Sequence, residues 1–414
     1  DIYSHAELGY KEFQTSGKFV KKMEQLGLRT EKGFAITGVK AYLNKDKKEN
    51  ASLALLGELD ALRIPEHAFA NPETNAAHCC GHHAQMAGVF GAALALTVPE
   101  IAEKLDGQVV FFATPAEEYG EIEFKNQLRE QGKIRYGGGK CELLRIGAFD
   151  DIDLCLTHHI RPGNEILVGS GTGNGFVSKV IRVLGKASHA AGAPEKGVNA
   201  LSAASLGLQA LGLNRETFRD EDCVRVHPII TKGGNLVNVI PDEVVVETLV
   251  RGKTIEAFTD AAKKTDRSFK AGAIAMGAKV EISTLPGYLP TLAEEALPEL
   301  KHAAEISASG IPVIEASGHA GGSTDVGDVQ HLMPVYTFNT GGVKGGLHQI
   351  DFEVTDEEEA YIVTAKMFAL AAYGLLKEKA QRSRELVDQY EPVFKNSAEY
   401  VEFMEQFDSK EIFE

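Results

Sequence analysis

Histidine and cysteine residues gather in one short stretch of this chain, His-Cys-Cys-Gly-His-His at positions 78–83. Thiolate and imidazole groups are good ligands for zinc, manganese and related ions. Gly81 permits a tight backbone path on which Cys80 and His82 can converge. A structural zinc site, or a buried cysteine beside surface histidines, is the alternative. Structural zinc sites usually carry a second closely spaced ligand pair, which this sequence lacks.

Two adjacent carboxylates form a second candidate group. Glu117 and Glu118 end the stretch Thr-Pro-Ala-Glu-Glu, directly after the apolar run 109–112, which reads as a buried strand. Open α/β sheets bind ligands at the carboxyl ends of their strands. Because neighbouring side chains diverge, one carboxylate can bind a metal while the other faces water. A solvated acidic turn is the alternative.

Two further groups contain histidines that also follow predicted strands. His158 and His159 come after the run 152–156, and His348 follows the predicted strand 335–339 and a glycine-rich loop. A single histidine of this kind is more often structural than a ligand. Taken together, the four groups supply the Cys, Glu and His side chains that two divalent metals would need.

The elements around these groups predict an α/β fold with a mostly parallel central sheet. Apolar runs at 53–56, 109–112 and 152–156 read as buried strands, separated by helices with apolar residues at helical spacing. This alternation is typical of a parallel sheet that is covered on both faces. The same alternation of strands and helices returns after residue 287, with helices predicted at 293–307 and 357–376.

An inserted domain is predicted between these two parts. A glycine-rich stretch at 169–175 precedes the order strand, helix, strand, strand, helix, strand, which is that of a ferredoxin-like α/β sandwich. The expected boundaries are 1–174 and 286–380 for the discontinuous catalytic domain and 175–285 for a lid or dimerisation domain. Residues 381–414 are expected to form a C-terminal helical extension.

Composition excludes several classes of function. The 414 residues carry a formal net charge of −16, which argues against a nucleic-acid partner. No stretch approaches the roughly 20 apolar residues that span a bilayer, so no membrane association is expected. Five thinly spread cysteines do not make a disulfide scaffold, and reduced thiols in a cytoplasmic enzyme are the plainer interpretation.

The order of these motifs resembles the amidohydrolase branch of the aminoacylase/glutamate-carboxypeptidase metallohydrolase family. Hippurate, indole-acetyl-amino-acid and aminobenzoyl-glutamate hydrolases belong to this branch. The resemblance covers about residues 1–375. The motifs that carry it are His-Ala-Glu-Leu-Gly-Tyr-Lys-Glu at 5–12, Gly-Glu-Leu-Asp-Ala-Leu at 57–62, Cys-Gly-His at 80–82, Pro-Ala-Glu-Glu at 115–118, the His-x-x-Pro motif ending at Pro162, Asn-Val-Ile-Pro at 238–241 and the late histidine.

The resemblance implies a role for each matching residue in a site with two divalent metals, manganese or zinc. Glu117 would be the general base. The metal ligands would be Cys80, His82, Glu118, His159 and His348. Two positions beside these ligands depart from the family pattern, because His83 replaces an acidic residue and Thr114 replaces a glutamine.

Four further residues complete the implied site. His189 would stabilise the oxyanion, in the family within the active site of the partner subunit; a helix-capping histidine is the alternative. Asn238 and Arg251 would hold the carboxylate of the substrate, since a guanidinium forks well onto a carboxylate; an ordinary surface arginine is the alternative. Asp325, in a glycine-rich loop, would lie near the metals; an Asx-turn is the alternative.

These inferences predict hydrolysis of the amide bond of an N-acyl amino acid, aminobenzoyl-glutamate or a similar compound, by water that the metals activate. A dipeptidase or carboxypeptidase of the same family would use the same metals and base. A binding protein that has lost catalysis is the remaining alternative, although Glu117 and the five ligand candidates are all retained. The resemblance also implies a homodimer formed through the lid domain.

Overall fold

The computed structural model describes residues 1–308 and 310–414, which form two compact units. The first unit comprises residues 1–171, 292–318 and 328–399. The second comprises residues 172–291, 319–327 and 400–414. The second unit thus contains two segments, 319–327 and 400–414, that lie outside the 175–285 range expected from the sequence.

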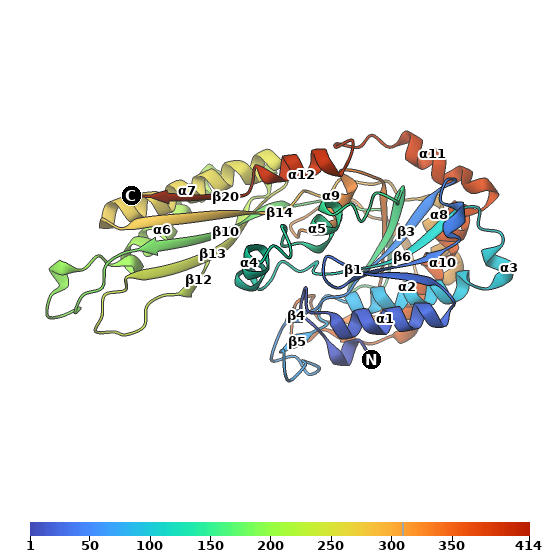
Figure 1. Cartoon of the computed structure of the whole chain (residues 1–414), viewed down its shortest axis with the longest axis horizontal. Helices are drawn as coiled ribbons and strands as arrows, with labels where there is room; N and C mark the ends of the chain where they lie inside the picture. The colour runs from blue at the N-terminus through green and yellow to red at the C-terminus, as the bar shows by residue number, and fades with distance from the viewer. Residues whose placement is uncertain (309) are drawn as a thin grey trace. The chain divides into compact units, whose positions relative to one another are not determined.

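An eight-stranded mixed sheet forms the centre of the first unit (Figure 1). Its four middle strands, β6, β3, β7 and β17, run parallel to one another. In spatial order the strands are β1 (Arg29–Phe34), β2 (Gly38–Leu43), β6 (Gln108–Thr114), β3 (Ser52–Glu58), β7 (Leu154–Ile160), β17 (Val335–Thr340), β8 (Ile166–Val168) and β15 (Val313–Glu315). Every residue of β3 and β6 is buried, as expected for the continuous apolar runs of a covered parallel sheet.

Four helices share one apolar core with this sheet: α1 (Phe13–Gln25), α2 (His82–Leu96), α8 (Pro298–Ser307) and α10 (Thr364–Leu376). Two glycines let α2 approach α10 closely. A Cβ added to Gly88 would lie 2.4 Å from Cγ2 of Thr364, and one added to Gly91 would lie 2.4 Å from Cβ of Ala365. The helix that begins at His82, two residues after Cys80, is therefore held against the core by backbone-to-side-chain contact.

One helical stretch, Glu358–Leu376, is long and apolar enough to cross a membrane by length and composition alone. The sequence analysis did not expect such a stretch. Its apolar side chains Met367, Phe368 and Leu375 are fully buried in the core of the first unit. Core helices of globular domains have this same composition, so the packing accounts for the apolar character.

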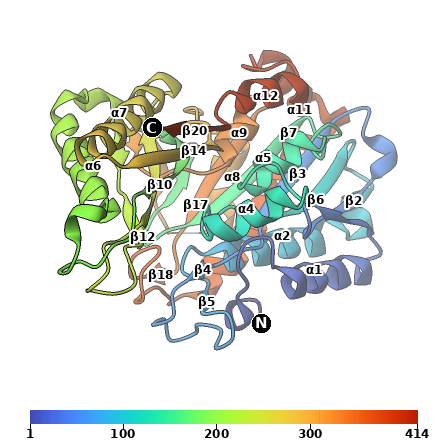
Figure 2. The ribbon, with the colours of Figure 1, turned by 60° about the vertical axis from the view of Figure 1, so that its left-hand side comes forward.

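A second, antiparallel sheet forms the other unit, with helices α6 (Ala200–Asn214) and α7 (Ile255–Met276) side by side (Figure 2). Its strands are β11 (Arg225–Val226), β12 (Ile229–Lys232), β13 (Glu243–Gly252), β10 (Gly175–Leu184), β14 (Lys279–Tyr288) and β20 (Ser409–Phe413). Along β13, buried and half-buried residues alternate, as in a sheet with one face on the core. The α/β architecture with a mostly parallel sheet and a ferredoxin-like insertion is confirmed.

Three predicted elements differ from the structure. The predicted strand 224–231 is two short strands, because Pro228 between them has no N–H to donate. The predicted helix 293–307 begins only at Pro298, where the fixed φ of proline suits the first helical turn. The C-terminal extension is not wholly helical: after α11 (Gln381–Gln389) and α12 (Ser397–Glu405), its last residues form β20, which pairs with β14.

Candidate metal centre

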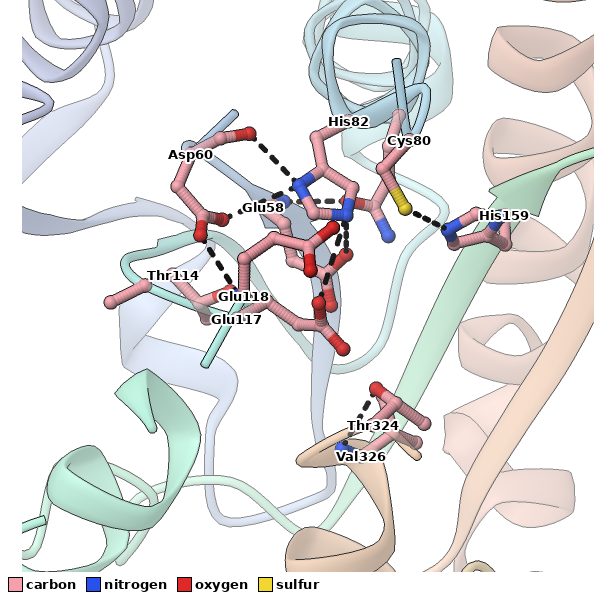
Figure 3. A network of polar contacts seen from close by, with 12 residues as sticks. Glu58, Asp60, Cys80, His82, Thr114, Glu117, Glu118, His159, Thr324 and Val326 are labelled. Carbon is pink, nitrogen blue, oxygen red and sulfur yellow. Dashed lines mark hydrogen bonds and ion pairs between the residues drawn. The ribbon is translucent and has the colours of Figure 1, made fainter. Parts of the chain in front are cut away.

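The five predicted metal ligands lie together in the first unit, around the ends of β6 and β7 and the start of α2. Figure 3 shows four of them, Cys80, His82, Glu118 and His159. The possible ligand atoms of the five residues form groups in which all atoms lie within 4.8 Å of one another. One group contains Cys80, His82 and His159, and another contains Cys80, Glu118 and His348. Since Cys80 belongs to both groups, the arrangement offers two adjacent positions for a cation that share one thiolate.

Individual distances show how tightly these atoms converge. The Sγ atom of Cys80 lies 3.3 Å from Nε2 of His159 and 3.2 Å from Nε2 of His348. The same Nε2 atom of His348 lies 3.2 Å from Oε1 of Glu118. Thiolate sulfur, imidazole nitrogen and carboxylate oxygen are the donors that zinc and related ions bind in proteins.

Backbone carbonyls set the tautomers of two of the histidines. Nδ1 of His82 lies 2.9 Å from the carbonyl oxygen of Asp60, and Nδ1 of His159 lies 2.8 Å from that of Ile160. Because a carbonyl oxygen only accepts, each Nδ1 must carry the hydrogen. In the neutral ring the lone pair is then on Nε2, the nitrogen that faces the other ligands. Hydrogen bonds of this kind commonly orient metal-bound histidines.

A strained turn presents the two adjacent glutamates after β6. Ala116 has a φ of 48°, in the left-handed region that non-glycine residues seldom adopt. Its N–H donates to Oε1 of Glu12 at 2.8 Å, and its carbonyl accepts from the N–H of Gly139 at 3.0 Å. Burial, followed by the charge of Asp60, raises the pKa of Glu12 to about 7. The turn is thus held from both sides by buried hydrogen bonds.

Glu118 and Glu117 point in different directions from this turn (Figure 3). The N–H of Glu118 donates to Oδ2 of Asp60 at 2.9 Å, and its carbonyl accepts from Nζ of Lys125 at 2.6 Å. Oε2 of Glu117 lies 3.9 Å from Nε2 of His82, and Glu117 is 8% exposed. Glu117 is therefore beside the ligand group, yet still reachable by solvent.

Two buried atoms of the site test whether a metal fits. Neither Nε2 of His82 nor Oε1 of Glu118 makes a well-directed hydrogen bond within the described part of the chain. Each has an ion-pair contact at 3.2 Å, but a buried polar atom without a good hydrogen bond is unfavourable by up to about 3 kcal/mol. A divalent cation would satisfy both at once, so the donor set and its unsatisfied atoms fit the metals that the sequence implies.

The protonation states of the metal-free ligands point the same way. Burial, with the charge of Glu118, raises the pKa of Cys80 well above its ordinary value. Burial alone would lower the pKa of His82, but the charges of Cys80 and Glu58 raise it well above its usual range. Protons therefore occupy this cluster until a cation takes their place, and metal binding should release them.

Three supporting residues were not assigned by the sequence analysis. Asp60 contacts both His82, with Oδ1 3.3 Å from Nδ1, and the Glu118 backbone. Glu58 lies with Oε2 3.2 Å from Nε2 of His82, and its other oxygen pairs with the fully buried Lys140. The motif at 57–60, which follows a predicted strand, could have indicated Glu58 and Asp60. No sequence pattern indicated that Glu58 pairs with Lys140, because the two residues are far apart in the chain.

Alternation along β7 separates the two neighbouring histidines. His159 faces Cys80, whereas Nε2 of His158 lies 2.8 Å from Oγ1 of Thr340 and its ring packs 4.9 Å from that of Phe338. Opposite orientation of successive side chains is the rule in a strand. The His-x-x-Pro register therefore selects the histidine that faces the ligand group.

The two departures from the family pattern lie in different surroundings. His83 is buried in an aromatic cluster, with its ring 4.6 Å from that of Tyr3 and 5.4 Å from that of His78. Thr114, at the end of β6, donates from Oγ1 to the carbonyl of Gly57 at 3.3 Å. His83 is therefore part of the packing behind the ligands, and Thr114 ties β6 to β3.

The remaining predicted residues belong to the second unit. Nδ1 of His189 accepts from the N–H groups of Ala191 and Gly192 at 3.2 and 2.9 Å, so its Nε2 carries a hydrogen available to donate. The carbonyl of Asn238 accepts from Ala190 in the same turn, at 3.0 Å.

Arg251 and Asp325 lie elsewhere in the second unit. Nη1 of Arg251 donates to Oγ of Ser323 at 3.2 Å, and Asp325 is fully buried just before α9 (Val326–Gln330). The roles that the resemblance implies for His189, Asn238, Arg251 and Asp325 stay predictions.

Comparison with known proteins places this geometry in context. Residues 54–373 match the family model described as Peptidase family M20/M25/M40. Xaa-Arg dipeptidase of Mus musculus is 28% identical over 311 residues, which are 73% of this chain and 64% of that protein. The aligned region thus spans less than two thirds of that relative.

Two Bacillus subtilis proteins align over more of their length. N-acetyl-L-cysteine deacetylase is 25% identical over 395 residues, 92% of this chain and 88% of that protein. The crystal structure of a dinuclear metal binding peptidase of the M20 family superposes with a TM-score of 0.62 at 24% identity, covering 91% of this chain and 96% of that one. At this identity the superposition shows the shared fold.

Proposed function

The chain belongs to peptidase family M20/M25/M40, and we propose that it hydrolyses the amide bond of N-acyl amino acids. Its family makes it a metal-dependent hydrolase of amide or peptide bonds. The convergence of Cys80, His82, Glu118, His159 and His348 in one cluster of ligand atoms supports the proposal more than any other observation. N-acyl amino acids similar to aminobenzoyl-glutamate are the proposed substrates, and dipeptides are the alternative.

These five side chains would hold two divalent ions, zinc or manganese. Bound ions supply Lewis acidity, which lowers the pKa of water and polarises a carbonyl group. His82 and His159 are oriented for this role by their carbonyl partners, and Cys80 is shared between the two groups. Asp60 would fix the ligands His82 and Glu118 relative to each other.

Glu117 is the proposed general base. A base must lie within reach of the water and of the departing nitrogen, and its carboxylate must be free to exchange a proton. Glu117 lies beside the ligand group without being needed to complete the five-residue set. It would take a proton from the attacking water and deliver it to the amide nitrogen as the C–N bond breaks.

Residues of the second unit would complete the reaction and bind the substrate. His189, with its Nε2 hydrogen, is the proposed donor to the tetrahedral oxyanion. Arg251 and Asn238 are proposed to hold the substrate carboxylate. Asp325 is proposed to lie beside the ligands and hold their orientation.

Dimerisation through the second unit is a further part of the proposal. The resemblance implies that His189 acts in the active site of a second copy. The same unit exposes apolar side chains at Ile229 (61% exposed), Leu236 (65%) and Val237 (103%). An unpaired strand edge with such side chains suits association with another protein surface.

A cytoplasmic location is also proposed. All five cysteines are free thiols, and Cys80 can bind a metal only while its sulfur is unoxidised. A reducing compartment keeps such thiols available.

Three glutamine substitutions on one loop test the mechanism. We expect Glu117→Gln to keep two equivalents of metal and lose about 100-fold or more in kcat, because it removes only the base. Glu118→Gln should lose bound metal in addition to turnover. Glu121→Gln is the matched control, since Glu121 pairs with Lys11 away from the ligands and should affect neither. Unchanged turnover in Glu117→Gln would remove Glu117 from the mechanism.

A substrate panel separates the proposal from its rivals. Release of free amino acid should be measured from N-acyl-glutamate, N-acyl-aspartate, hippurate and dipeptides by the metal-loaded enzyme. Cleavage of acyl amino acids over dipeptides supports the amidohydrolase. Preference for dipeptides would favour a dipeptidase, and no hydrolysis across the panel would favour a binding protein.

A further inference from the structure

Two arginines lie directly opposite each other in the sheet of the second unit. The antiparallel pairing of β11 with β13 sets Arg225 against Arg251. Directly opposed residues of an antiparallel pair project their side chains to the same face and contact each other closely. Like charges in such a pair are destabilising. A negative charge beside this pair would therefore relieve the repulsion between the two arginines.

The two arginines differ in how far the protein itself satisfies them. Arg251 donates to Oγ of Ser323, and its guanidinium lies 5.5 Å from the centre of the Phe176 ring. Arg225 is exposed, and its Nη1 donates to the carbonyl of Val224 at 2.9 Å. Within the described part of the chain, no carboxylate forms an ion pair with Arg225. Arg225 thus holds a full positive charge with only a neutral partner.

Two more basic groups surround this pair. Lys253 follows Arg251 by two residues, and β13 ends between them, at Gly252. Burial and then the charges of Lys253 and Arg225 lower the pKa of His319. In a chain with a net charge of −16, such a concentration of positive charge is local. The field at this end of the sheet attracts an anion.

Open volume lies next to Arg225. It lines a cavity of about 370 Å³ together with Arg215, Arg219, His227 and the acidic Asp220. Arg219 is neutralised by Glu221. Cavities of this size accept small ligands or parts of them. The Arg225 guanidinium can therefore be approached by a ligand group and does not need to displace packed side chains.

We propose that Arg225 determines substrate specificity by binding the side-chain carboxylate of an acidic amino acid. The preferred substrates are then N-acyl-glutamate or N-acyl-aspartate. This inference rests on the proposed function, in which Arg251 holds the α-carboxylate. Two guanidinium groups that project to the same face of a sheet can receive the two carboxylates of one such molecule, each through a forked hydrogen bond. A substrate ending in a basic residue, as the name Xaa-Arg dipeptidase describes for one relative, would be repelled by the same cluster.

Matched substrates test this assignment. We compare kcat/KM for N-acyl-glutamate and N-acyl-glutamine carrying the same acyl group, because the two differ only in charge. The metal-loaded enzyme should favour the glutamate substrate by about 10- to 100-fold, the range of a charge-assisted hydrogen bond. Arg225→Gln should remove this preference through KM for the glutamate substrate, with kcat and the glutamine substrate little changed. Arg225→Glu should instead favour N-acyl-lysine.

Arg182→Gln is the matched control. Arg182 lies on the same sheet, six residues beyond Phe176 along β10, where Glu243 and Glu281 neutralise it. This variant should keep the preference for glutamate. The inference is overturned if the unmodified enzyme prefers neutral or basic side chains, or if Arg225→Gln keeps the preference. Hydrolysis of N-acyl-glutamine in either case would leave the proposed function standing, whereas no hydrolysis of any acyl amino acid would refute that function.

Discussion

Replacing Gly81 by alanine should disturb the turn that brings Cys80 and His82 together. Gly81 has a φ of 90° and lies immediately before α2. A Cβ at this position would lie 2.0 Å from Cγ2 of Ile160, which is 1% exposed and held in β7. The substitution therefore combines an unfavourable backbone conformation with a clash against a rigid neighbour.

The two effects can be given rough magnitudes. An L-residue in the left-handed region is disfavoured by about 1–2 kcal/mol. Forcing an extra methyl group into a well-packed core destabilises by about 1–3 kcal/mol. Gly81→Ala should therefore lower the free energy of unfolding of the metal-free enzyme by about 2–5 kcal/mol. Any relief of the clash moves Cys80 or His82, so metal affinity should fall by about 10- to 100-fold, as it does when residues that orient ligands are changed.

Two control glycines separate these contributions. Gly277 has a φ of 65° with no atom within 4 Å of an added Cβ, so Gly277→Ala should show only the backbone effect. Gly17 lies inside α1 with open space and no positive φ, so Gly17→Ala should stabilise by up to about 1 kcal/mol. Urea unfolding of the chelator-treated proteins measures stability, and titration with zinc measures affinity.

The order of stability of the three variants tests whether contact with Ile160 shapes the turn. Gly81→Ala must be the least stable, Gly277→Ala intermediate and Gly17→Ala the most stable. If Gly81→Ala unfolds at the same urea concentration as Gly277→Ala and binds zinc with unchanged affinity, then contact with Ile160 does not shape the turn.

Three further predictions concern stability. Burial raises the pKa of Glu294 to about 8 against the opposing hydrogen bonds from Thr337. The folded state therefore stays protonated at pH values above 4.5, the ordinary pKa at which the unfolded chain loses this proton. The free energy of unfolding therefore falls as the pH rises from about 4.5 towards 8. In urea unfolding, Glu294→Gln should be more stable than the unmodified protein by a few kcal/mol at pH 9, with no such gain at pH 4. Deleting residues 409–414 removes β20 from the edge of β14, and calorimetry should show a lower unfolding temperature, with more aggregation by light scattering. Asn199→Ala removes the side chain that caps α6, and denaturant unfolding should report a loss of about 0.5–2 kcal/mol.

Apolar runs and their ends carried most of the information that the sequence held about this fold. The runs at 53–56, 109–112 and 152–156 predicted β3, β6 and β7 because strands covered on both faces need continuous apolar residues. Parallel strands end at the same edge of a sheet, so the polar residues after them had to meet. That rule located the candidate site without knowledge of any contact.

Other features depend on tertiary contacts that leave no local pattern. Ala116 and His348 adopt positive φ although neither is glycine. Ala116 is held there by Glu12, more than a hundred residues earlier, and the N–H of His348 donates to the carbonyl of Cys79 at 2.9 Å. Strand β20 is largely exposed and lacks an apolar alternation, and it forms because β14 offers an edge with unpaired backbone groups.

The same distant contacts explain why the ligand atoms are close together without a metal. The Sγ atom of Cys80 lies 3.3 Å from Nε2 of His159 and 3.2 Å from Nε2 of His348, so protons can bridge these atoms when no metal is bound. The carbonyl of Ile160 holds the ring of His159, and the carbonyl of Cys79 anchors the loop of His348. The fold therefore holds the ligands close together before a cation binds, which reduces the reorganisation that metal binding requires.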